Sequence, residues 1–75
     1  MRNLHEVKAG QRAVIVDVQG SSRFLSRATS IGLTRGLEIE MLHNEARLPL
    51  LLFGRDTVIA LNREDGQQIQ VEVVA

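Results

Sequence analysis

One segment, Ser30–Met41 (SIGLTRGLEIEM), changes the periodicity of the apolar residues and so constrains the fold more than any other. Before it, apolar residues recur at the spacing of one helix face: Phe24, Leu25, Ala28 and Ile31. In its second half, apolar residues alternate with acidic ones as in a half-buried strand: Leu37, Ile39 and Met41. Gly32 and Gly36 stand between the two patterns, and glycine adopts the left-handed conformation that ends a helix without steric cost. The segment therefore predicts a helix-to-strand corner.

Other stretches have the composition of short strands separated by turns. A turn at Gly10 precedes the first of them, and a polar turn over residues 62–67 precedes the last. The predicted strands cover residues 12–18, 37–41, 48–53, 57–61 and 68–74. Residues 3–7 are predicted to form a helical turn in which Leu4 and Val7 point inward. The sequence predicts one domain over residues 1–75, mostly β: a small SH3-like, partly open barrel of about five strands with one inserted α-helix.

Composition excludes some ways of stabilising so small a chain. The 75 residues contain no cysteine, so disulfides and thiolate zinc sites are excluded. No signal peptide or membrane-spanning stretch is apparent, so we expect a cytoplasmic protein without direct membrane insertion.

Residues 1–37 carry six basic and two acidic side chains, whereas residues 38–75 carry three basic and seven acidic ones. This asymmetry indicates either cross-strand ion pairs or an interaction surface.

No constellation of catalytic residues is present. His5 and His43 fall in no nucleophile–base motif, and the glycines of the corner are not followed by the Gly-Lys-Ser/Thr of a phosphate-binding loop. His43 and Glu45 are the best-spaced pair of metal ligands, and two ligands make a weak site. We therefore expect no enzymatic activity, no cofactor and no specific metal site.

The segment VKAGQRAVIVDVQG looks like a KOW motif, which occurs in RNA-binding barrels. However, the chain has zero net charge and only two aromatic residues, Phe24 and Phe53. RNA-binding domains usually combine a basic patch with exposed aromatic rings. We therefore expect no nucleic-acid partner, and an RNA-binding module remains an alternative.

The stretch Leu48–Phe53 (LPLLLF) is apolar on both faces of the predicted strand. In a small barrel one face of a strand lies in the core and the other faces water, unless a helix covers it. The second face is therefore either covered by the helix or exposed as a surface for a partner or for weak self-association.

The order of these signals resembles the FeoA family of bacterial ferrous-iron uptake. The resemblance lies in Leu4, Ala9-Gly10, the helix end Arg27–Leu33, the corner Thr34–Ile39, Pro49, Ala60–Arg63 and Ile69–Val71. It implies an SH3-like barrel without enzymatic activity, located in the cytoplasm and recruited to the inner face of the membrane. It also implies a partner, the FeoB-type membrane transporter with its cytosolic GTPase domain.

On this resemblance we expect the helix face and the apolar strand to dock the partner. The docking residues are predicted to be Arg23, Arg27, Leu50, Leu51, Leu52 and Phe53. Gly10, Gly32 and Gly36 are predicted to be structural turn residues. A similar barrel forms the C-terminal regulatory domain of iron-dependent repressors, so a regulatory domain of that type is a second alternative.

Overall fold

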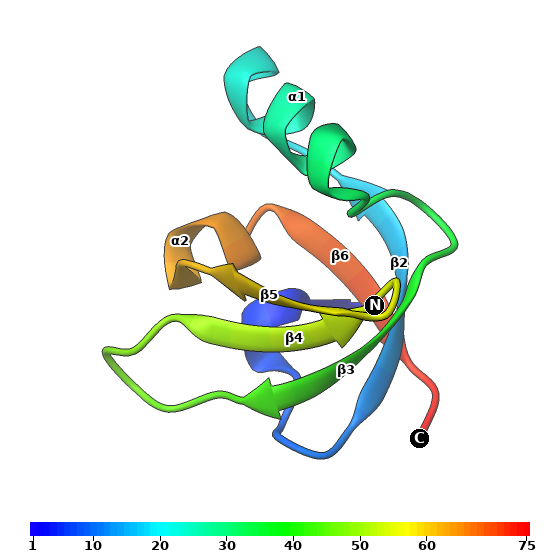
Figure 1. Cartoon of the computed structure of the whole chain (residues 1–75), viewed down its shortest axis with the longest axis vertical. Coiled ribbons are helices and arrows are strands. Elements are labelled where there is room, and N and C mark those ends of the chain that lie inside the picture. Colours follow the sequence, from blue (N-terminus) through cyan, green and yellow to red (C-terminus); the bar gives the residue numbers. More distant parts are fainter.

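The computed structural model describes all 75 residues and contains one curled antiparallel sheet (Figure 1). Its strands, in the spatial order β1-β6-β2-β3-β4-β5, leave β1 and β5 as the two edges, so the barrel is partly open. The strands are β1 (Arg2–Asn3), β2 (Arg12–Val18), β3 (Glu38–His43), β4 (Leu50–Gly54), β5 (Thr57–Leu61) and β6 (Ile69–Val73). The helical elements are η1 (Leu4–Glu6), α1 (Ser22–Ile31) and α2 (Arg63–Gly66). The predicted fold class is confirmed, and the sixth strand is the two-residue β1.

The N-terminal turn η1 closes one side of the barrel. The backbone N–H of Asn3 donates a hydrogen bond to the Glu6 carboxylate at 2.9 Å, which fixes the start of the turn. Leu4 and Val7 are fully buried, as their spacing predicts.

A β-bulge in β2 moves its last apolar residue to the other side of the strand. Alternation places Val14 and Val18 on the same face, opposite Ile15. In the structure the pairing of β2 with β6 shifts by one residue between Ile15 and Asp17. An extra residue inverts the facing of those after it, so Ile15 and Val18 both contact the core.

The corner that follows α1 has the predicted conformation. Ser21 caps the helix, because its hydroxyl oxygen accepts a hydrogen bond from the Phe24 N–H at 3.1 Å. Gly32 ends the helix with φ of 87°, and Gly36 has the same φ in the second turn. The N–H of Gly36 donates to the Ile15 carbonyl at 2.8 Å, which ties the corner to β2. The corner thus fixes both the end of α1 and the start of β3.

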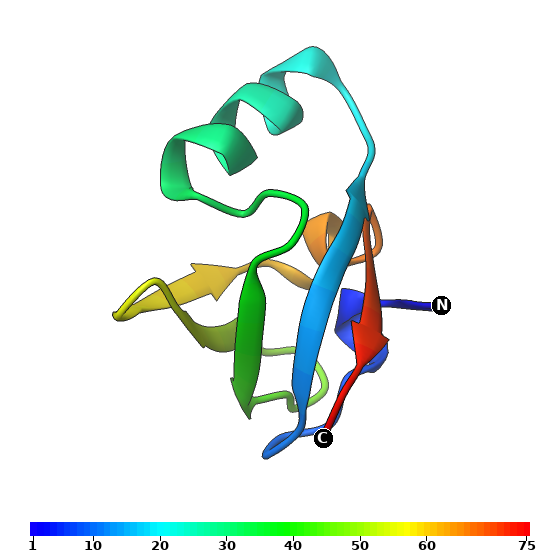
Figure 2. The same cartoon turned by 90° about the vertical axis from the view of Figure 1, so that its right-hand side faces the viewer.

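Helix α1 contacts the barrel with a narrower stripe than its sequence predicts. Phe24 and Ala28 are buried, whereas Leu25 and Ile31 are 37% and 42% exposed. Figure 2 shows the reason: α1 lies across one end of the curled sheet, so only one edge of the helix faces it. None of the helices is both long and apolar enough to cross a membrane.

The core lies inside the curled sheet and consists of 15 apolar residues. They are Leu4, Val7, Ala13, Ile15, Phe24, Ala28, Leu33, Ile39, Met41, Leu50, Leu52, Ile59, Leu61, Ile69 and Val71.

The predicted polar turn over residues 62–67 contains the short helix α2. The Asn62 side chain caps this helix, because its oxygen accepts a hydrogen bond from the Asp65 N–H at 2.8 Å.

Two of the three ion pairs join the basic N-terminal half of the sequence to the acidic C-terminal half. Arg12 lies 3.5 Å from Glu38, on the adjacent strand, and Arg27 lies 2.5 Å from Asp65, in α2. These contacts support cross-element pairing as one cause of the charge asymmetry.

Candidate docking surface

Strand β4 alternates between core and surface. It begins at Leu50, immediately after Pro49, and pairs with β3 on one side and β5 on the other. Leu50 and Leu52 have no exposed surface, whereas Leu51 is half-buried and Phe53 is 41% exposed. Leu50 and Leu52 therefore cannot contact a partner, contrary to the prediction, and only Leu51 and Phe53 of the predicted docking strand are accessible to one. Helix α1 does not cover these two side chains.

The neighbouring strands extend this apolar surface. Strands β4 and β5 are joined by a tight turn at Arg55 and Asp56, which have φ of 54° and 60°. This turn sets a register in which Leu51 lies opposite Ala60, and Phe53 lies opposite Val58, which is 57% exposed. Leu48, which precedes the strand, is 52% exposed. We call the resulting surface the β4–β5 outer face; it consists of Leu48, Leu51, Phe53, Val58 and Ala60.

A hollow of about 360 Å³ lies at one end of the β4–β5 outer face. Its floor follows a row across three strands, because His43 pairs with Leu51 and Leu51 with Ala60. Its lining residues are His43, Glu45, Leu48, Pro49, Leu51 and Ala60. A cavity lined mostly by apolar side chains with a few polar ones at its rim is the usual form of a binding site.

The predicted basic helix face is a separate surface. Arg23 and Arg27 line one shallow depression with Ser26 and Ser30, and no hollow is lined by residues of both this face and the β4–β5 outer face. Arg27 is held by its ion pair with Asp65, and its guanidinium lies 5.7 Å from the centre of the Phe24 ring. Arg23 forms no ion pair.

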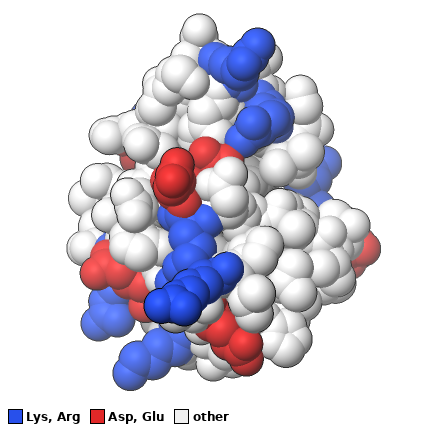
Figure 3. All heavy atoms as spheres, turned by 90° about the vertical axis from the view of Figure 1, so that its left-hand side faces the viewer, with Lys and Arg blue, Asp and Glu red and all other residues white.

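Charges of both signs are mixed on the side of the molecule where α2 and the β3–β4 loop lie. Figure 3 shows basic side chains at the top, separated by acidic ones from a second basic group below. Phe24 is buried, which leaves Phe53 as the one exposed aromatic ring of the chain. Neither feature suits the stacking and electrostatic contacts by which proteins bind single-stranded RNA.

No group of three or more His, Asp or Glu side chains is placed to hold a metal ion. Asp17 accepts hydrogen bonds from Gln19 at 3.1 Å and from Arg35 at 3.0 Å, and these contacts lower the pKa of its carboxyl group. The three glycines predicted to be turn residues, Gly10, Gly32 and Gly36, all have φ in the left-handed region; that of Gly10 is 89°.

Sequence reasoning missed part of this surface. Val58 and Ala60 alternate with the buried Ile59 and Leu61, so the stretch TVIAL has the same two apolar faces as LPLLLF. That pattern was available as a signal. The contribution of Leu48 was not, because it depends on where β4 begins.

The fold defines a class: a small, partly open SH3-like barrel, here with an exposed apolar face on β4 and β5. The profile of the FeoA domain matches residues 2–73, and the chain belongs to the FeoA family. No protein of curated function has significant sequence similarity to the chain.

Solved structures of other proteins share the fold. The crystal structure of an iron uptake regulatory protein, FeoA, has a TM-score of 0.91 at 20% identity and covers 97% of both chains. FeoA of Stenotrophomonas maltophilia in complex with zinc, described as a prokaryotic SH3-domain protein, has a TM-score of 0.83 at 23% identity; the match covers 96% of this chain and 91% of that one. A manganese-dependent transcriptional repressor has a TM-score of 0.89 at 16% identity, and the match covers 97% of this chain but only 41% of the repressor. These identities are low, so the three likenesses establish the fold alone.

Proposed function

We propose that the protein is an accessory factor of ferrous-iron uptake that binds the cytosolic GTPase domain of a FeoB-type transporter and performs no chemistry itself. Membership of the FeoA family supports the link to iron uptake. The S. maltophilia relative is described as a candidate activating factor for ferrous-iron transport, which agrees with a regulatory role. The protein acts in the cytoplasm, and its partner recruits it to the inner face of the membrane.

The β4–β5 outer face is the observation that carries this proposal. It places five apolar side chains on one side of a two-stranded hairpin, and three of them, Leu48, Phe53 and Val58, are each more than 40% exposed. Water contact with grouped apolar surface is unfavourable, so such a patch on a small domain marks a partner site. Leu51 lies at the centre of the face and is its expected anchor. Arg23 and Arg27 supply a secondary contact through α1.

Titration of the protein into the isotope-labelled cytosolic domain of the cognate transporter tests the proposal, with and without a GTP analogue. We expect amide shifts on both proteins, and on this protein they should centre on Leu51 and Phe53. Leu51→Asp should abolish the shifts. Val74→Asp is the control, because it places the same charge on an exposed apolar residue outside both α1 and the β4–β5 outer face.

A titration without shifts at high micromolar concentration would overturn the proposed partnership with this domain. Concentration-dependent shifts of the protein alone at Leu51 and Phe53 would instead assign the face to self-association.

The structural likeness to a metal-dependent repressor concerns the fold, and no further observation favours a repressor-type function for this chain.

A further inference from the structure

We infer that the hollow at the end of the β4–β5 outer face receives an extended partner segment in which an apolar residue and an acidic one are two positions apart, on the same face of the segment. The inference rests on the proposed function in taking this face as the docking surface. It adds the chemistry of the segment that binds there: an apolar group for the hollow and an acidic group for two arginines beside it.

The apolar half of the site is the hollow between β4, β5 and the residues that precede β4. Leu48 and Pro49 form one wall, and Leu51 and Ala60 form the floor. One aliphatic side chain fits such a space, and its burial is favourable at roughly 25 cal/mol for each Å² of apolar surface removed from water.

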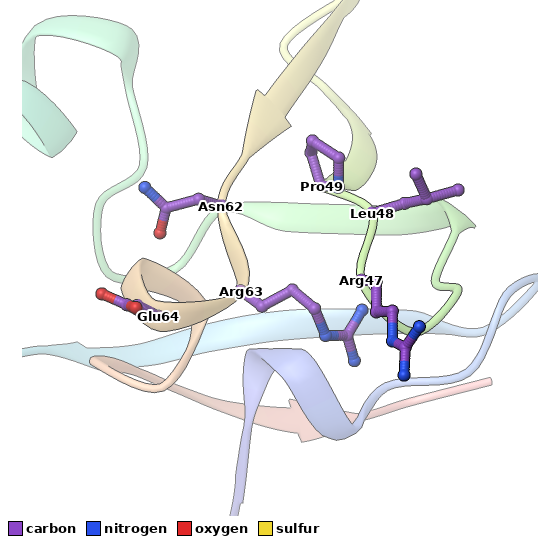
Figure 4. Close-up of a pocket in the computed structure, with 6 residues that line it drawn as sticks. All are labelled: Arg47, Leu48, Pro49, Asn62, Arg63 and Glu64. Atoms are coloured by element: carbon purple, nitrogen blue, oxygen red, sulfur yellow. The ribbon is translucent and has the colours of Figure 1, made fainter.

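The basic half lies on the other side of Leu48 and Pro49. These two residues also line a second hollow, of about 370 Å³, whose other lining residues are Arg47, Asn62, Arg63 and Glu64. Leu48 and Pro49 are thus a ridge shared by an apolar hollow and a hollow with two guanidinium groups. In Figure 4 the side chains of Arg47 and Arg63 extend to the same side, and Glu64 extends to the opposite one.

The two arginines form no ion pair within the protein. Arg63 is held in place: its Nη1 donates to the Asn44 side-chain oxygen at 2.7 Å and to the Glu45 carbonyl at 3.1 Å. Asn44 in turn donates to the backbone carbonyls of His5 and Val7. Because these bonds fix the guanidinium before any ligand arrives, its remaining N–H donors are available at little entropic cost.

Arg47 is an arginine at a backbone position that suits glycine. Its φ is 71°, in the left-handed region, and its side chain is exposed without a hydrogen-bond partner in the protein. Two like charges at one hollow repel each other, and a carboxylate between them removes the repulsion and can accept charged hydrogen bonds from both. The carboxylates nearest in sequence, Glu45 and Glu64, accept no bond from either guanidinium.

These halves together identify the occupant. A purely apolar partner leaves both guanidinium groups uncompensated, and a simple anion leaves the apolar hollow in contact with water. Side chains two residues apart lie on the same face of an extended segment, so an apolar and an acidic residue at that spacing satisfy the two hollows at once, since the hollows share one ridge.

A titration of the labelled protein with three short peptides tests the inference without the transporter. The peptides are acetylated and amidated forms of GLEELG, its basic counterpart GLKKLG and its non-apolar counterpart GGEEGG. We expect GLEELG to shift the amides of Arg47, Leu48, Leu51 and Ala60. The other two peptides should bind at least about tenfold more weakly.

Two matched variants separate the role of the guanidinium from folding. Arg47→Gly removes the guanidinium where the backbone favours glycine, so the protein should fold at least as well. It should weaken GLEELG about tenfold, which corresponds to about 1.4 kcal/mol. Arg55→Gly makes the same change at another exposed arginine with positive φ, outside both hollows, and should change the affinity less than twofold.

Equal responses to GLEELG and GLKKLG, shifts confined to α1, or unchanged binding by Arg47→Gly would each overturn the inference. The transporter domain distinguishes this failure from that of the proposed function. If that domain binds the wild type and Arg47→Gly equally, the inference fails and the proposed function stands. If the peptides bind as expected and the transporter domain does not, the proposed function fails and the chemistry of the surface stands.

Discussion

Replacing Gly32 and Gly36 by alanine provides a matched test of how the corner is held. Both residues have φ of 87°, so either substitution forces an alanine into the left-handed region at about 1 kcal/mol. Around Gly36 a Cβ meets nothing within 4 Å, whereas at Gly32 it overlaps Cδ and Nε of Arg55. The Arg55 side chain must then leave its packing position and rotate into water, which we expect to cost about 1 kcal/mol more. Gly36→Ala should therefore destabilise the domain by about 1 kcal/mol and Gly32→Ala by about 2 kcal/mol.

Urea denaturation of four variants measures these differences. In a domain of this size 1 kcal/mol also lowers the thermal midpoint by about 4–8 °C, so the two single variants are distinguishable. In an Arg55→Ala background the Gly32→Ala substitution should cost only about 1 kcal/mol, because no side chain remains to be displaced. The reasoning is refuted if Gly32→Ala and Gly36→Ala have equal effects, or if the Arg55→Ala background leaves the effect of Gly32→Ala unchanged.

Three further predictions concern the strand, the loop and the acid stability of the domain. Leu51→Asp should lower the free energy of unfolding by only about 1 kcal/mol, because Leu51 is half-buried and aspartate is unfavourable in a strand, whereas Leu52→Ala should lower it by about 2–5 kcal/mol, because Leu52 is in the core; urea unfolding of both variants checks this. Asn44→Ala should destabilise the domain by about 2–3 kcal/mol and speed amide exchange in η1, since two backbone carbonyls and Arg63 lose a partner; normal exchange in η1 would contradict this. The Asp17 carboxyl has a pKa below its ordinary 3.8, so its contribution to stability is present above that pH and is lost as the pH falls through the folded-state value. Asp17→Asn should accordingly lose less stability than the wild type when the pH is lowered below about 4, and unfolding curves at pH 2–7 measure the difference.

Local backbone preferences explain which features could be predicted from the sequence. Gly32 and Gly36 define the end of α1 and the turn after it through their own conformations, and the structure agrees at both. Apolar alternation located the strands but could not say which face of residues 48–53 is buried, because both faces carry leucine. That choice depends on pairing with β3 and β5, which lie elsewhere in the sequence.

Contacts between distant residues explain what could not be predicted. Arg63 and Asn44 are 19 residues apart, and nothing in either local sequence indicates that they meet. The bulge in β2 is set by pairing with β6, so the inward position of Val18 does not follow from alternation. The two hollows depend on strand pairing and on the hydrogen bond between Arg63 and Asn44. Only the structure therefore shows that Leu48 and Pro49 separate them.

The pairing of the first strand with the last determines how this domain can be joined to other sequences. Arg2 lies opposite Val71 in an antiparallel pair, so the chain enters the domain and leaves it at the same end of one strand pair. Both connections can therefore be lengthened, or led into a neighbouring domain, without crossing the barrel or opening the sheet. The β4–β5 hairpin is at the opposite edge of the strand order. The barrel can consequently be joined to other sequences at this end while the β4–β5 outer face stays exposed.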